Sequence, residues 1–145
     1  MAYSVQADIE KSLPTATVAL LTDDVNGTTI DVAVLNEAVA DADETIDAYL
    51  RSRYTVPLNP VPAIIKKLSV DLAIWELYTR RPESETPEDV KTLHADALKL
   101  LKDVQAGRAQ IGAPEETDEA LGSYKTNRVA DDRVFDTDKL DRMLS

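Results

Sequence analysis

The stretch Arg51–Arg81, RSRYTVPLNPVPAIIKKLSVDLAIWELYTRR, decides the fold of this chain. A proline-rich loop leads into a very apolar predicted helix, from about Pro62 to Arg80, which holds the only tryptophan. Apolar side chains cover more than one stripe of this helix: Ile64, Ile65, Leu68, Val70, Leu72, Ala73, Ile74, Trp75, Leu77 and Tyr78. A helix that is apolar around most of its circumference is buried by neighbours on several sides. We therefore expect the helix over 62–80 to be the centre of a bundle.

The composition is that of an ordinary single domain. The 145 residues are 43% hydrophobic and 30% charged, which suits a soluble chain with one modest core. The absence of cysteine excludes a disulfide scaffold, a thiolate metal site and a cysteine nucleophile. No apolar run is long enough to span a membrane, and the N-terminus lacks the pattern of a secretory signal.

The net charge of −11 argues against direct binding of nucleic acid. Such binding depends on lysine and arginine side chains that displace counterions from phosphates. The acidity therefore fits either solubility alone or a surface that must not adhere to DNA.

Two helices are expected before the central one. Ser4 is the expected cap of a short helix over 5–13, which Pro14 ends, and residues 15–29 are expected to be loop. Asp31 is the expected cap of an amphipathic helix over 32–53. The polar face of that helix carries five carboxylates without a histidine, which we interpret as a solvated acidic face: Glu37, Asp41, Asp43, Glu44 and Asp47.

The turn Asp23–Gly27 has oxygen ligands of the kind that calcium prefers. A calcium loop with Gly27 at its sixth position would begin at Thr22 and end at Ala33. Neither end supplies the carboxylate that such loops require, so we favour a plain turn.

The loop YTVPLNPVP, residues 54–62, is expected to be rigid because three prolines fix its backbone. The apolar residues Tyr54, Val56 and Leu58 lie between them. They are candidates for contact with a neighbouring subunit, and packing on the chain's own core is the alternative.

Asp71 and His94 are two polar residues near the core that could serve as catalytic groups. Asp71 lies between the apolar rows of the central helix, where an ion pair with Lys67, Arg51 or Arg53 is the favoured interpretation. Thr86 and Pro87 predict the start of a last long helix, and Gly107 predicts its end. His94, the only histidine, lies at the edge of its apolar stripe and is interpreted as a packing or surface residue.

The residues after Gly107 form a polar arm with apolar residues near its end. Residues 111–132 show no periodicity, and RVFDTDKLDRMLS follows, with a short helix expected near Asp136 or Thr137. The expected fold is thus all-α, a small bundle of about four helices over 1–107 and an extended C-terminal arm over 108–145. The arm is expected to dock on a partner, or alternatively to fold back on its own domain.

Four stretches resemble the Mu-like bacteriophage family of small head–tail connector proteins. They are YSVQADIEKSL (3–13), the long run from Leu21 to Leu58 that ends in IDAYLRSRYTVPL, VPAIIKKLSVDLAIWELY (61–78) and RVFDTDKL (133–140). The order and spacing of the four pieces carry the resemblance, which covers nearly the whole chain.

The resemblance implies a structural virion protein without catalysis and without a cofactor or metal. Copies would form a ring beneath the portal protein, extend the DNA channel without specific DNA binding, and carry the next neck protein. The expected location is the neck of the virion, and the host cytoplasm during assembly. The arm residues implied in docking to the portal are Arg133, Val134, Phe135, Lys139, Leu140, Met143 and Leu144.

Contacts between neighbouring subunits are expected to join the acidic helix to the basic end of the central helix. The candidates are Asp43 and Asp47 on one copy, and Arg80 and Arg81 on the next. An acidic monomeric binding or regulatory adaptor is the alternative function, and an enzyme ranks third because the sequence offers mainly carboxylates for a site.

Overall fold

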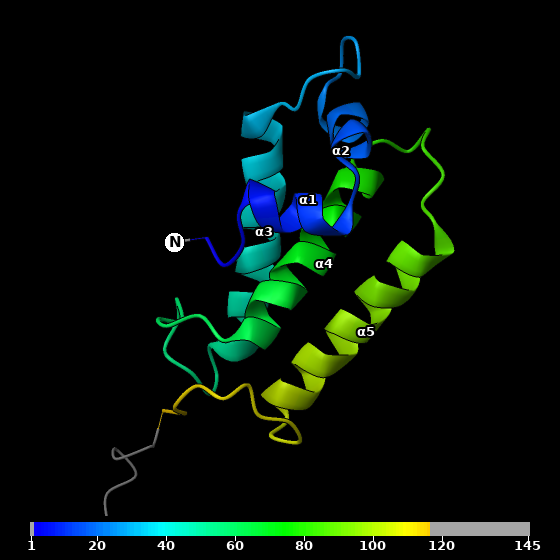
Figure 1. Cartoon of the computed structure of the whole chain (residues 1–145). Coiled ribbons are helices and arrows are strands. Elements are labelled where there is room, and N and C mark those ends of the chain that lie inside the picture. The colour runs from blue at the N-terminus through cyan, green and yellow to red at the C-terminus, as the bar shows by residue number, and fades with distance from the viewer. Residues whose placement is uncertain (1, 117–145) are drawn as a thin grey trace, which may run out of the picture.

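The computed structural model describes residues 2–116, and within that range it contains five helices and no strand. They are α1 (Gln6–Ser12), α2 (Thr15–Thr22), α3 (Val32–Leu50), α4 (Ala63–Thr79) and α5 (Glu88–Gln105). Helices α3, α4 and α5 run antiparallel in succession, and the short helices α1 and α2 cross them (Figure 1). The predicted all-α fold is confirmed.

Helix α4 lies at the centre of the bundle, as its sequence predicts. It contacts each of the other four helices. Its buried side chains point in several directions around the helix: Ile65, Leu68, Ser69, Val70, Asp71, Leu72, Ala73, Ile74 and Leu77. The apolar residues of α3 and α5 each form one stripe that packs against the core, as amphipathic helices do.

Helix α2 corrects the prediction that residues 15–29 form a loop. Pro14 ends α1, but it also stands at the N-cap of α2, where its missing N–H costs nothing. The buried residues Val18, Ala19 and Leu21 pack into the core. Tertiary packing therefore stabilises a short helix that periodicity alone did not reveal.

Two predicted caps are also corrected. Ser4 is buried and its hydroxyl lies 2.7 Å from that of Ser69, while Val5 takes the N-cap position of α1. Thr86 does not cap α5, because Pro87 occupies the N-cap without any side-chain hydrogen bond.

The other two predicted helix signals are confirmed. The Asp31 carboxylate accepts hydrogen bonds from the N–H groups of Ala33 and Val34, at 3.0 and 3.3 Å. Gly107 ends α5 with φ +79°, a conformation that favours glycine.

Candidate interaction surfaces

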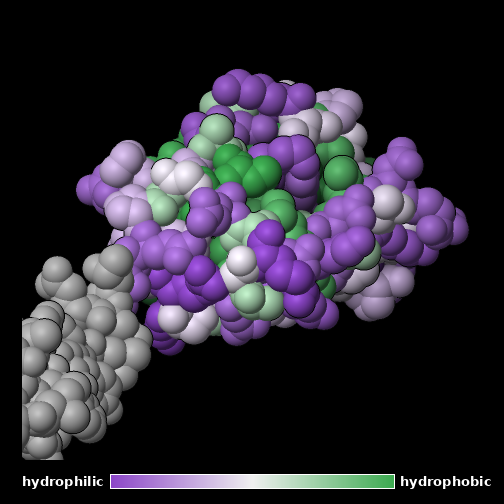
Figure 2. Space-filling view, turned by 90° about the horizontal axis from the view of Figure 1, so that it is seen from below, coloured by the Kyte–Doolittle hydropathy of each residue, from purple (hydrophilic) through white to green (hydrophobic). Residues whose placement is uncertain are grey.

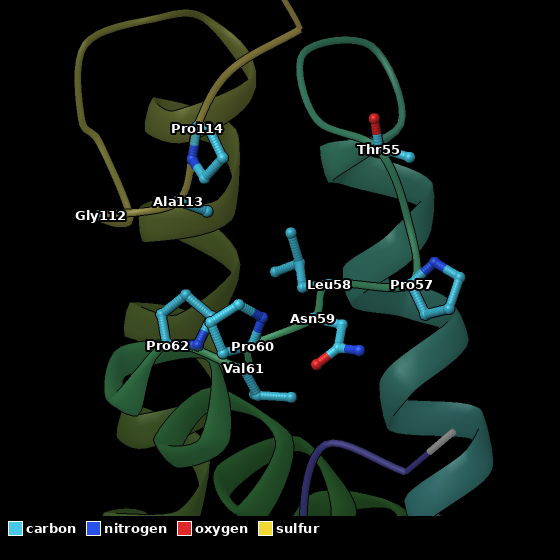
Figure 3. Close-up of a pocket in the computed structure, with 10 residues that line it drawn as sticks. All are labelled: Thr55, Pro57, Leu58, Asn59, Pro60, Val61, Pro62, Gly112, Ala113 and Pro114. Carbon is cyan, nitrogen blue, oxygen red and sulfur yellow. The ribbon is translucent and has the colours of Figure 1, made fainter.

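A hollow of about 310 Å³ lies at the end of the bundle where α3 ends and α4 begins. We call it the proline pocket, and Figure 3 shows that residues from two separate segments face it. It is lined by Thr55, Pro57, Leu58, Asn59, Pro60, Val61, Pro62, Gly112, Ala113 and Pro114. Seen from this end, hydrophobic surface gathers in the middle of the face and hydrophilic surface surrounds it (Figure 2).

Hydrogen bonds hold the two walls of the proline pocket together. Arg53 donates to Glu115 at 2.7 Å, and the Tyr54 hydroxyl donates to the same carboxylate at 3.3 Å. Thr55 donates to the Glu116 carboxylate at 2.6 Å, and the N–H of Glu116 donates to the carbonyl of Arg53 at 2.9 Å. We call this set of bonds the clasp. It fixes the chain after α5 against the loop after α3.

No sequence pattern predicts the clasp, because Glu115 and Glu116 belong to a polar run without periodicity. Ile111, just before them, is buried at 5% exposure and also anchors the segment. The predicted arm therefore begins as a structured wall of the pocket, up to Glu116. The seven predicted portal-docking residues, from Arg133 to Leu144, lie outside the described residues.

The loop residues proposed as subunit contacts differ in exposure. Tyr54 and Leu58 are buried at 1% and 4% and belong to the chain's own core, which was the alternative interpretation. Val56 is half-buried and packs against the same core. Contact between this loop and a neighbouring subunit stays a prediction.

The acidic face of α3 is only partly solvated, which corrects that interpretation. Glu37, Asp41 and Glu44 are exposed, but Asp43 is buried at 7%. Asp43 accepts hydrogen bonds from the main-chain N–H of Tyr3 at 2.8 Å and from the Ser69 hydroxyl at 2.6 Å.

Tyr3 extends this network to the proline loop. Its hydroxyl donates to Asp47 and accepts a 3.0 Å hydrogen bond from the N–H of Leu58. Burial raises the pKa of Asp43, and the bonds from Ser69 and Tyr3 oppose that rise. The network thus links the N-terminal segment, α3, α4 and the loop, and its role is structural.

Arg80 and Arg81 have partners within the same chain. Both guanidinium groups contact the Asp24 carboxylate at 2.6 Å, and they also donate to the carbonyls of Leu21 and Asp23. Their predicted pairing with Asp43 or Asp47 of a neighbouring copy stays a prediction, and it would compete with these bonds.

The turn after α2 is held by its own hydrogen bonds. The Asp23 carboxylate accepts from the N–H groups of Val25, Asn26, Thr28 and Thr29 at 2.9–3.4 Å, which lowers the pKa of Asp23 to about 2. Residues 2–116 contain no group of three or more metal-ligating side chains. The Asp23 carboxylate is thus bonded within the turn itself.

The remaining polar candidates also have structural partners. Lys67 pairs with Asp71 at 2.8 Å, which confirms the predicted ion pair. His94 stacks on Trp75, with ring centroids 4.1 Å apart and planes 14° from parallel, and it is a packing residue. No helix within the described range has the length and apolar character to cross a membrane.

Comparison with known proteins places the chain among phage proteins. The "Mu-like prophage FluMu protein gp36" of Haemophilus influenzae is 32% identical over 94 residues, 65% of this chain and 63% of that protein. "Gene product J" of Escherichia phage Mu is 32% identical over 87 residues, 60% of this chain and 59% of that protein. The chain thus matches somewhat under two thirds of the length of each relative. The family described as "Bacteriophage Mu, Gp36" matches residues 3–129, and the chain therefore belongs to this family.

Proposed function

We propose that this protein is a structural subunit of the phage neck, a head–tail connector. Copies form a ring beneath the portal, extend the DNA channel and carry the next neck protein. The family match over residues 3–129 carries the proposal, because it extends over both the helical bundle and the start of the arm. The four resembling stretches support the connector role within that family.

The bundle itself supports a structural role rather than catalysis. Two polar candidates for a catalytic role within residues 2–116 are bonded into the fold. Asp43 is bonded to Tyr3 and Ser69, and Asp71 to Lys67. The His94 ring stacks on that of Trp75. A catalytic site requires convergent, accessible polar groups, which these are not.

The exposed carboxylates suit a ring through which DNA slides. Glu37, Asp41 and Glu44 line one side of α3, and Glu76 of α4 lies beside them in shared hollows. Burial, and then the charge of Asp41, raises the pKa of Glu76. A channel wall of this kind would repel phosphates. An assembled ring with a basic or neutral lumen would contradict this part of the proposal.

Electron microscopy of the protein with its portal tests the connector role. We expect a ring of density on the portal for the full chain, and none after deletion of residues 133–145. Circular dichroism of the shortened chain should be nearly unchanged, because the helices of the described range lie within residues 6–105. Docking of the shortened chain would show that the arm is not the portal contact, and no ring with either chain would contradict the connector role.

A monomeric acidic binding adaptor is the second candidate. The observation that favours it is that Arg80, Arg81, Asp43 and Asp47 are already bonded within the chain. This function predicts a monomer both alone and with the portal. Analytical ultracentrifugation of the mixture separates the two functions, since only a connector joins the portal.

A further inference from the structure

The proline pocket is a preformed apolar hollow with polar residues around it. Its volume of about 310 Å³ lies at the lower end of the range for ligand pockets, a size suited to one or two large apolar side chains. Prolines 57, 60, 62 and 114 stiffen its walls, and the clasp holds the two walls together. A stiff, concave apolar surface surrounded by polar residues is typical of a binding site.

The position of the clasp indicates which segment can reach the pocket. Pro114 lines the pocket, and Glu116 is hydrogen-bonded to Arg53 and Thr55, so the chain continues toward residue 117 from the rim. Residues 117–133 then precede Val134 and Phe135, the first strongly apolar pair of the remaining chain. Extended, they span up to roughly 55–60 Å, which is more than enough to return to the rim.

Effective concentration favours the chain's own segment. The pocket wall runs directly into Glu115 and Glu116, so the segment that follows is tethered at the rim. A short tether also gives a local concentration of about millimolar, whereas the entropy of closing a longer loop rises only slowly.

We propose that Val134–Phe135 occupies the proline pocket of its own chain in the free protein. The inference rests on the proposed function, in which the same segment docks on the portal. The pocket then stores the docking segment until the portal competes for it. Storage keeps the apolar pair of a free subunit away from other copies before assembly.

Disulfide trapping tests the storage contact in the free protein, without portal. The chain has no cysteine, so introduced pairs react against a clean background. One variant combines Asn59→Cys, at the exposed edge of the pocket, with Asp136→Cys, which leaves the apolar pair intact. The matched control combines Glu83→Cys with Asp136→Cys. Glu83 is exposed and belongs to the loop between α4 and α5, which lies at the opposite end of the bundle (Figure 1).

We expect the pocket pair to form an intramolecular disulfide about tenfold faster than the control, at a rate independent of protein concentration. Adding Phe135→Ala to the pocket pair should lower the rate to that of the control. Disulfides mainly between chains, at a rate that rises with concentration, would overturn the proposal in favour of a second copy. Equal rates for pocket and control pairs, or no effect of Phe135→Ala, would overturn it outright. Because the portal is absent, each of these outcomes is independent of whether the connector function holds.

Discussion

The main-chain N–H of Tyr3 donates a 2.8 Å hydrogen bond to Oδ2 of Asp43, forty residues further along the chain. Ser69 of α4 donates to the other oxygen of the same carboxylate at 2.6 Å. A buried carboxylate is costly unless hydrogen bonds satisfy it. Asp43 therefore joins three segments that meet only in the folded chain.

Replacing Asp43 with alanine should detach the N-terminal segment. The variant leaves the N–H of Tyr3 without its acceptor in a buried place, so we expect the free energy of unfolding to fall by about 1–3 kcal/mol. Urea unfolding followed by circular dichroism measures the loss. Glu44→Ala is the matched control, an exposed carboxylate on the same helix, for which we expect a change within about 0.5 kcal/mol. Equal losses in the two variants would contradict a stabilising role for the network.

The sequence predicted those elements whose pattern is long or whose end signals are local. The apolar residues of α4 recur over 17 residues, and Asp31 and Gly107 act on backbone groups close to them in sequence. Helix α2 has only eight residues, and its stability comes from contacts with α3 and α4. A local sequence pattern cannot predict such contacts.

The same reason explains why the burial of Asp43 differs from the prediction. The position of Asp43 off the apolar stripe of its helix predicts a solvated carboxylate, because its partners Tyr3 and Ser69 are far away in sequence. The clasp between Arg53 and Glu115 also joins distant residues. Local sequence specifies helices, whereas these bonds depend on how the helices pack.

Replacing Gly107 with alanine should weaken the clasp. A Cβ at this position would overlap Nη1 of Arg53, so the guanidinium that bonds Glu115 would have to move. Gly112→Ala is the matched control, because Gly112 has nearly the same φ, +78°, and open space around its Cβ. We expect the control to lose about 1–2 kcal/mol from backbone strain alone, and Gly107→Ala to lose more. Chemical denaturation of both variants checks this, and equal losses would show that the Arg53 contact contributes nothing.

The pairing of Asp24 with two arginines predicts a dependence of stability on acid pH. The hydrogen bonds from Arg80 and then Arg81 lower the pKa of Asp24 from 3.8 to about 2. A carboxyl whose pKa is lower in the folded state contributes stability that is present above pH 3.8 and is lost as pH falls toward about 2.

The variant Asp24→Asn isolates this contribution from the other carboxylates. We expect the difference in unfolding free energy between the natural chain and the variant to shrink between pH 4 and pH 2. Added salt should reduce the same difference at neutral pH, because the group is exposed. A Glu83→Gln variant, which changes an exposed loop carboxylate, is the matched control for the loss of one negative charge. A constant difference for Asp24→Asn would contradict the ion pairs.

Because His94 stacks on Trp75, the fluorescence of the tryptophan can report on the contact between α4 and α5. The imidazole of α5 lies 4.1 Å from the indole of α4, and burial lowers the pKa of His94 below 6.5. A histidine whose pKa is lower in the folded state contributes stability that is present above pH 6.5 and is lost as pH falls through the folded value. Protonation places a charge against the only tryptophan, so its fluorescence should change as the histidine titrates.

We therefore expect a fluorescence titration with its midpoint below pH 6.5 in the folded chain. His94→Gln should remove this transition while it keeps a polar side chain of similar length on α5. Circular dichroism across the same range separates titration from unfolding, because the helices should persist through the midpoint. A midpoint at or above 6.5 would show that the imidazole is solvated, and the contact between α4 and α5 would then be looser than the stack implies.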